Sequence, residues 1–250
     1  MDLKRKKFQG VINILNFNRH FYISGFIVWG LTAIYSNLFG LSSLNFWVIT
    51  AAITYGLTMP LIVSAYVYDF SGYYDFDWLS KTGLTDNKPE QIVTINAGYD
   101  ETSYILKSKF PNADLKVYDF YKAKLNTEPA IVSTRKINSV YPNTQHIKAH
   151  QIPMNDKSVD LVFLLSSAHE IRSHKEKVLF LKECHRICKP NGKVITVEHL
   201  RDAPSFLAFS IGFTHFFSRN SWGKAFKDSG FSSFDETKFT SVMSIFISKP

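Results

Sequence analysis

The hydrophobic and polar positions divide the chain into two unlike parts. From residue 21 to residue 68 there are 48 consecutive residues without Asp, Glu, Lys or Arg. Within this stretch, residues 21–39 and 44–68 are separated by a short uncharged turn at 40–43. As helices they would be roughly 28 Å and 37 Å long, against about 30 Å for the hydrocarbon core of a bilayer. The pattern predicts a hairpin of two membrane-spanning helices.

The charges beside this hairpin predict its orientation. Residues 1–68 carry five basic groups and one acid, and four of the basic groups lie at residues 4–7. Basic flanks favour the cytoplasmic side of a membrane. Because both ends of a hairpin lie on the same side, we expect an integral membrane protein whose large C-terminal part is in the cytoplasm.

Aromatic residues and a proline add two expectations. Trp47 lies near one end of the second span, and several aromatic residues gather near its other end, as in the aromatic belt of a membrane interface. Pro60 predicts a kink within the span, which membrane helices tolerate. The aromatic residues of the predicted belt near the other end are Tyr66, Tyr68, Tyr73, Tyr74 and Trp78.

Three alternatives compete with the membrane hairpin. A cleaved signal peptide is disfavoured because the apolar region is too long and continues in a second span. A buried hairpin in a soluble core would normally keep a polar face. A basic arm that binds nucleic acid is disfavoured because the basic stretch is short and leads directly into membrane-length apolar sequence. We therefore expect no nucleic-acid partner.

The segment 69–89 is polar and rich in turn-forming residues, and we interpret it as a linker or a short juxtamembrane helix. After it, strand and helix patterns alternate along the chain. The sequence predicts an α/β fold: a doubly wound, mostly parallel seven-stranded sheet of Rossmann-like type with an antiparallel terminal strand. The predicted domains are 1–68, 69–89 and 90–250. The predicted strands are 91–97, 114–118, 145–149, 158–166, 193–198, 231–239 and 242–248, and the predicted helices are 103–110, 127–140, 175–188 and 222–228.

Composition narrows the function classes only a little. The chain has 250 residues and a net charge of +8, so one full-sized domain accompanies the hairpin. The two cysteines, Cys184 and Cys188, are four positions apart in a predicted helix and exclude a disulfide framework. The histidines show no spacing that predicts a metal site, and we expect none.

The carboxyl ends of the first two predicted strands carry a candidate ligand site. A small-residue turn around Gly98 follows the first strand, and Asp119 ends the second, 21 residues later. A carboxylate at this point can accept hydrogen bonds from the two hydroxyls of a ribose. The alternative for Asp119 is an N-cap of the following helix.

In this order of segments the chain resembles the class I S-adenosylmethionine-dependent methyltransferases. The resemblance covers about 90–250 and is most specific in residues 152–162 (IPMNDKSVDLV) and in the Lys-Pro-Asn-Gly turn at 189–192. It implies that the cofactor is S-adenosyl-L-methionine and that residues 166–170 face its sulfonium. The cofactor-binding residues that it implies are Asn96, Ala97, Gly98, Tyr99 and Asp100 around the methionine part, Asp119 at the ribose, and Ala149 and Gln151 near the adenine.

The chain departs from this family's pattern in the glycine-rich turn. The family usually has an acid at the position of Thr94 and glycines at those of Asn96 and Asp100, so that only Gly98 remains of the three. Asp100 or Glu101 could replace the missing carboxylate. A membrane-tethered scaffold that has lost catalysis is therefore the alternative to an enzyme.

A methyl acceptor with a proton to lose would need a general base. The resemblance and the strand ends suggest His169 and Glu170 after the fourth strand, and Glu198 and His199 after the fifth, with His215 further on. Each of these residues could instead be an ordinary solvated or hydrogen-bonded loop residue. We predict His169, Glu170 and His215 as the catalytic set.

The segment 204–218 (PSFLAFSIGFTHFFS) predicts the kind of acceptor. On one helix, Phe206, Phe209, Phe213, Phe216 and Phe217 would share a face, which could dip into a membrane interface, line an apolar pocket or pack in the core. Together with the hairpin, this favours a membrane-anchored methyltransferase that acts on a lipid-like or aromatic acceptor at the cytoplasmic face. A tethered methyltransferase with a soluble small-molecule substrate is a further alternative.

Overall fold

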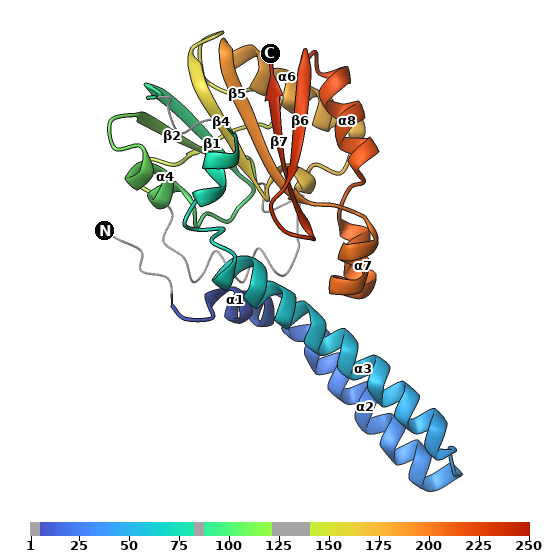
Figure 1. Ribbon diagram of the computed structural model, residues 1–250. Helices are drawn as coiled ribbons and strands as arrows, with labels where there is room; N and C mark the ends of the chain where they lie inside the picture. The colour runs from blue at the N-terminus through green and yellow to red at the C-terminus, as the bar shows by residue number, and fades with distance from the viewer. Residues whose placement is uncertain (1–5, 83–87, 122–140) are drawn as a thin grey trace.

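The computed structural model describes residues 6–82, 88–121 and 141–250. The short helix α1 (Gln9–Phe17) leads into α2 (Arg19–Phe39) and α3 (Ser43–Ser64), which lie side by side and project away from the rest of the molecule (Figure 1). Gly40 ends α2 in the left-handed region at φ 68°, and the Ser42 hydroxyl caps α3 by accepting from the N–H of Asn45. The turn thus lies where the sequence predicts it.

The hairpin exposes its apolar side chains. Mean hydropathy reaches 1.3 in Arg19–Phe39 and 1.8 in Ser43–Phe70, and no residue in either apolar window is buried. Phe26, Leu38 and Leu44, for example, are 65, 71 and 73% exposed. Helices in the core of a soluble protein would bury such residues. The two helices are long and apolar enough to span a membrane, by length and composition.

Part of the segment predicted as a linker or a short juxtamembrane helix packs in the core. α3 continues into a π-helix, η1 (Ala65–Phe70), and a 3₁₀ helix, η2 (Asp77–Thr82), follows. Val67, Phe76 and Trp78 are at most 1% exposed, and each large apolar side chain buried in this way contributes about 1.5–3 kcal/mol. Tyr73 and Trp78 therefore do not form the predicted aromatic belt, because they pack inside the protein.

Seven strands form one mixed sheet in the order β3-β2-β1-β4-β5-β7-β6. β1 to β5 are parallel, and β7 is antiparallel to both β5 and β6. This confirms the predicted fold class; the predicted helix at 127–140 lies outside the described residues. The strands are β1 (Gln91–Asn96), β2 (Asp114–Asp119), β3 (Gln145–His146), β4 (Val159–Leu165), β5 (Cys188–His199), β6 (Ser233–Lys238) and β7 (Met243–Lys249).

Helices and the juxtamembrane segment cover the two faces of the sheet (Figure 1). On one face, Val93, Val162 and Phe246 pack with residues of α6 and α8. On the other face, Ile92, Phe163 and Ile245 pack with Val67 to Leu79, with α4 and with α7. Successive side chains of a strand point to opposite faces, and β1, β4 and β7 are buried along almost their whole length, so both faces of the sheet are filled. The helices after β1 are α4 (Ser103–Lys109), η3 (Ala168–Glu170), α6 (His174–Ile187), α7 (Ala203–Phe209), η4 (Ser210–His215) and α8 (Arg219–Asp228).

The turn predicted at 189–192, between the helix at 175–188 and the fifth strand, is tighter than expected. β5 begins at Cys188, directly after α6, so the Lys-Pro-Asn-Gly residues lie within the strand's bounds. A Cβ on Gly192 would lie 2.7 Å from Cys188 Sγ and 2.8 Å from the Asp160 carbonyl oxygen. Only glycine fits there without displacing its neighbours.

The phenylalanine-rich segment does not form the single helix assumed from its pattern. α7 ends at Phe209, and Ser210 at φ 51° begins the 3₁₀ helix η4. The five rings therefore do not share one face. Phe206 packs on Phe213, Phe209 and Phe216 both contact the His199 ring, and Phe217 packs on Trp222.

Candidate active site

The turn after β1 and the acid at the end of β2 lie together. The Gly98 N–H donates to Asp119 Oδ1 at 2.9 Å, and the Tyr121 N–H donates to the same oxygen at 2.8 Å. The Asp119 side chain is 8% exposed, and its Oδ2 lies 3.9 Å from His146 Nδ1 at the end of β3. The carboxylate thus faces the turn and fixes its shape. The helix predicted at 127–140, which Asp119 could cap, lies outside the described residues, so the N-cap alternative stays open.

The backbone of this turn explains the missing glycines. Gly98 is left-handed, at φ 93°, whereas Asn96 and Asp100 have no positive φ. The latter two positions therefore need no glycine for their conformation. Asp100 Oδ1 accepts from the N–H groups of Thr102 and Ser103 at 3.0 Å each, so this side chain caps the start of α4.

The two carboxylates considered as replacements have different surroundings. Glu101 accepts from Asn13 Nδ2 at 3.0 Å and from the Tyr74 hydroxyl. Asp100 Oδ2 is buried and has no hydrogen-bond partner among the described residues, and the same holds for Asn96 Nδ2 and Thr94 Oγ1. Buried polar atoms without partners are unusual and indicate a place where a polar ligand group could bind.

Helix α1 contacts this turn. Asn13 Nδ2 donates to the Tyr99 hydroxyl at 2.8 Å, and the Phe17 and Tyr99 rings meet edge to face at 5.6 Å. The predicted adenine-side residues lie on the turn after β3, where Lys148 and Gln151 pair and Ala149 packs partly buried against the core. Gln151 is exposed, and nothing places it against the Gly98 turn.

A cluster of ionisable side chains lies at the ends of the neighbouring strands β4 and β5. His169 Nδ1 is 2.6 Å from Glu198 Oε2, and the His169 backbone N–H donates to Glu198 Oε1 at 3.2 Å. On the other side of the ring, His169 Nε2 is 3.1 Å from Glu170 Oε1, which also lies 3.5 Å from His215 Nε2. The structure therefore brings together all three residues predicted as the catalytic set and adds Glu198.

Burial and charge together shift the protonation of this cluster. Burial opposes a charge on His169, but the Glu198 and Glu170 carboxylates outweigh it and raise the pKa of His169 to about 10. Burial would raise the pKa of Glu170, but hydrogen bonds from His169 and His215 hold that pKa well below its usual range. The cluster is a compact set of opposite charges with low solvent exposure.

His199 is separate from this cluster. Burial lowers the pKa of His199 to about 4, so its imidazole is neutral. Its Nδ1–H donates to the Val242 carbonyl at 2.9 Å, and its Nε2 accepts from the Tyr68 hydroxyl at 2.8 Å. We interpret His199 as a structural residue that joins η1 to the end of β5, instead of a base.

Sequence reasoning missed the residues that hold these segments in place. Arg172 Nη1 donates to the carbonyls of His169 (3.3 Å) and His215 (2.5 Å). Arg201 donates to the carbonyls of Thr214 (2.8 Å) and Phe216 (2.7 Å). Bonds from a side chain to distant carbonyls leave no spacing pattern in the sequence, so they could not have been found there.

A strained residue and a hydrogen bond shape the turn that follows β4. Ser166, directly after β4, has φ 50°, and the Ser167 hydroxyl donates to the Ile95 carbonyl of β1 at 2.7 Å. Non-glycine residues in the left-handed region cost free energy and are enriched at functional sites. This turn ties the end of β4 to β1 beside the Gly98 turn.

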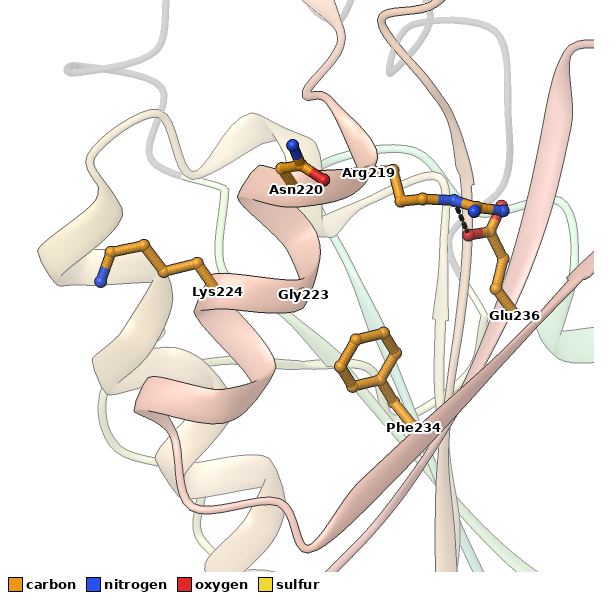
Figure 2. Close-up of a pocket in the computed structure, with 6 residues that line it drawn as sticks. All are labelled: Arg219, Asn220, Gly223, Lys224, Phe234 and Glu236. Atoms are coloured by element: carbon orange, nitrogen blue, oxygen red, sulfur yellow. Dashed lines mark ion pairs between the residues drawn. The ribbon is translucent and has the colours of Figure 1, made fainter.

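A pocket of about 580 Å³ lies elsewhere, between α8 and β6 (Figure 2). Arg219 and Glu236 form an ion pair across it at 2.5 Å. None of the residues predicted to bind cofactor or to act in catalysis lines it. Its lining residues are Arg219, Asn220, Gly223, Lys224, Phe234 and Glu236.

Comparison with known proteins identifies a methyltransferase domain in the chain. Residues 102–196 match the model of a methyltransferase domain, a stretch that includes Asp119, His169 and Glu170 but begins after the Gly98 turn. An uncharacterized methyltransferase from Schizosaccharomyces pombe is 28% identical over 116 residues, or 46% of this chain. The aligned part is 33% of that relative, so the chain matches about a third of its length.

Two solved structures share the fold across most of the chain. Human N-acetylserotonin methyltransferase in complex with SAM has a TM-score of 0.54 and 13% identity, covering 95% of this chain and 69% of the other. A putative O-methyltransferase from Nostoc punctiforme has a TM-score of 0.52 and 14% identity, covering 98% and 72%. Coverage this high takes in the N-terminal helices as well. The described residues from 88 onward thus have the fold of these methyltransferases.

Proposed function

We propose that the protein is a membrane-anchored methyltransferase that transfers a methyl group from S-adenosylmethionine to a hydrophobic acceptor at the cytoplasmic face. The observation that carries this proposal is the bond between the Gly98 N–H and Asp119, because it places an acid at the turn where this fold binds its cofactor. The 102–196 match to a methyltransferase domain supports the same conclusion.

The residues around the turn fit the cofactor. An ionised carboxylate offers about four lone-pair sites, so Asp119 can accept from ribose hydroxyls while it holds the two N–H groups of Gly98 and Tyr121. The buried Asp100 Oδ2 offers an acceptor for the ammonium of the methionine part, and Asn96 Nδ2 offers a donor for its carboxylate. These two residues stand where the family's glycines would be, and they add polar groups to the turn.

The cofactor supplies an activated methyl group on a sulfonium, which is a good leaving group, so this chain has only to orient the acceptor and remove its proton. The cluster of His169, Glu170, Glu198 and His215 lies at the ends of β4 and β5, beside the cofactor turn. His169 is oriented from behind by Glu198, as acid–base groups in active sites commonly are. Because its pKa is raised to about 10, His169 can accept the proton only in the fraction of the protein in which it is deprotonated. We assign the acceptor to this side.

The hydrophobic acceptor is inferred from the surroundings of the cluster. Leu207 and Ile211 are 58 and 72% exposed, and the Tyr55 hydroxyl of the hairpin donates to the Leu207 carbonyl at 2.6 Å. These exposed apolar residues of α7 and η4 therefore belong to a segment that contacts the hairpin, and Figure 1 shows α7 close to α3. An acceptor dissolved in the bilayer would meet this surface before it reaches the cluster.

The experiment that tests the reaction uses membranes that contain the full-length protein. They are incubated with S-adenosylmethionine labelled in its methyl group, and labelled products are identified by mass spectrometry in the organic and aqueous extracts. We expect label in an apolar product. Label only in a water-soluble product supports the tethered enzyme with a soluble substrate, and product binding without any transfer supports the scaffold.

A second experiment tests the anchoring and its orientation. Cys184 and Cys188 are buried, and burial raises the pKa of Cys188 to about 12, so neither should react with a membrane-impermeant maleimide. We expect Ser43→Cys in the hairpin turn to be labelled in intact cells, and Lys175→Cys on α6 only after lysis. Recovery of the protein as a soluble oligomer would instead assign the apolar helices to contacts between copies.

A further inference from the structure

We propose that His169, Glu170 and His215 form a binding site for a divalent transition metal ion of the zinc class. One atom from each, His169 Nε2, Glu170 Oε1 and His215 Nε2, lies within 4.8 Å of the other two. Two imidazoles and one carboxylate are a common ligand set for zinc and for other first-row metals that act as Lewis acids.

The spacing of the three atoms suits such an ion. Bonds of about 2.0–2.1 Å in a tetrahedral site place ligand atoms roughly 3.3–3.4 Å apart. The two separations from Glu170 Oε1 are 3.1 Å to His169 Nε2 and 3.5 Å to His215 Nε2. Small rotations of the side chains would bring all three atoms to one centre.

The site also has the outer support that metal ligands need. Glu198 Oε2 lies 2.6 Å from His169 Nδ1 and directs Nε2 of the same ring toward Glu170. A carboxylate behind a histidine ligand fixes its tautomer and raises its basicity. The Glu198 side chain is 1% exposed, so this support is shielded from water.

Two arginines fix the segments that carry the ligands. Arg172 bonds the carbonyls of both His169 and His215, and so joins η3 to η4 although Glu170 and His215 are 45 positions apart in the sequence. Arg201 holds the carbonyls on either side of His215. The ligand geometry is thus set by backbone anchors that do not belong to the cluster.

The site remains open to a further ligand. The side chains of His169 and Glu170 are 13% exposed and that of His215 is 32% exposed. Three protein ligands leave one position for water or for an oxygen of the substrate, as in catalytic zinc sites. If the proposed methyl transfer is correct, a metal there would bind the acceptor oxygen and lower the pKa of its hydroxyl; metal binding itself does not depend on that function.

The test measures metal binding to the full-length protein in detergent, without a histidine tag, after chelator treatment. Zn²⁺ is titrated by calorimetry, and Co²⁺ is added separately to record the visible absorption bands of a low-coordinate site. We expect about one equivalent of either ion. Glu170→Gln and His215→Ala should each lower the Zn²⁺ affinity by roughly 100-fold or more, and Glu198→Gln by about 10–100-fold.

The matched control is His174→Ala, which removes a histidine paired with Asp228 on the surface of α6, and it should bind Zn²⁺ as the unmodified protein does. Circular dichroism identifies any variant that fails to fold, and Glu170→Gln keeps the size of the side chain for this reason. The proposal is overturned if the unmodified protein binds less than a tenth of an equivalent, or if Glu170→Gln and His215→Ala retain its affinity. If the unmodified protein binds Zn²⁺ but transfers no methyl group, the proposed function is overturned and the metal site is not.

Discussion

The proposed cofactor side and the proposed acceptor side of the candidate site are built differently. Around Gly98, a short turn and the carboxylates of Asp119 and Asp100 form the candidate site, and the backbone N–H groups of Gly98 and Tyr121 donate to Asp119. Around His169, four ionisable side chains from three segments lie within hydrogen-bonding or ion-pairing distance of one another. The two sides occupy neighbouring strand ends of one sheet, so the fold alone does not explain the difference.

The difference between the two sides indicates on which side the protein itself has to supply reactive groups. A sulfonium donor carries its own reactivity, and its side of the site has only to bind and orient it. An acceptor that has to lose a proton needs charged groups that are held in place before it arrives. This division of roles would be established if variants on the cofactor side weakened cofactor binding and variants on the acceptor side lowered turnover.

The largest effect is expected for Asp119→Ala. The substitution removes the acceptor of two buried N–H groups as well as the ribose contact, so S-adenosylhomocysteine affinity should fall roughly 100-fold or more. Calorimetric titration in detergent measures it. Asp114→Ala, at the exposed start of the same strand and paired with Lys116, is the control and should bind normally. Unchanged affinity in Asp119→Ala would remove the basis of the proposed cofactor site.

The next effect is expected on the acceptor side. His169→Asn should lower kcat by about 100-fold or more and leave S-adenosylhomocysteine affinity within about twofold, because its partners lie at β4 and β5 and not at the Gly98 turn. His185→Asn on α6 serves as the control for turnover. If His169→Asn weakens cofactor binding as strongly as it slows turnover, the two sides are not functionally separate.

A smaller effect concerns the packing beneath the acceptor side. The pKa of His199 is lowered to about 4 by burial, whereas in the unfolded chain it is about 6.5. The unfolded state therefore binds the extra proton between these values, and stability should decrease as the pH falls from 6.5 to 4, by about 3 kcal/mol at most. Thermal unfolding at several pH values should show that the melting temperature of His199→Asn falls less steeply between pH 6.5 and 4 than that of the unmodified protein. An identical slope in both proteins would mean that His199 is not buried in its neutral form.

The smallest change in cofactor affinity is expected for a substitution at the contact between α1 and η1. A Cβ on Gly10 would lie 2.6 Å from Tyr68 Cβ and 3.1 Å from the Ser64 carbonyl oxygen, so Gly10→Ala should push α1 away from η1. Because Asn13 and Phe17 of α1 contact Tyr99, we expect a change of a few fold in cofactor affinity with kcat unaffected. Gly30→Ala has open space around its Cβ and provides the control. Equal affinities in the two variants would show that α1 does not influence the turn.

The sequence predicted the sheet well because its signals are local. Few other structures share the pattern of the apolar runs at 91–97 and 158–166, or that of the two closing strands. Gly98 and Asp119 stand at the strand ends where ligand sites of such sheets form. His169 and Glu170 were candidates because they follow the fourth strand, His215 was added from further along the chain, and the structure brings the three together.

What the sequence did not reveal depends on contacts between distant segments. Tyr73 and Trp78 are residue types that an interfacial belt also uses, and only their burial against the sheet shows that they belong to the core. The break at Ser210 depends on a left-handed residue that no periodicity signals, so the phenylalanines were wrongly placed on one face. The arginines that bond carbonyls on η3 and η4 leave no pattern either.

The burial of the segment from Val67 to Leu79 has a practical consequence for any shortened form of the protein. A chain cut at residue 90, where the strand pattern begins, would leave Ile92, Phe163 and Ile245 facing water on one side of the sheet. Such a fragment should aggregate during expression. A version suited to crystallisation has to start before Val67 and replace the exposed apolar residues of the preceding helices.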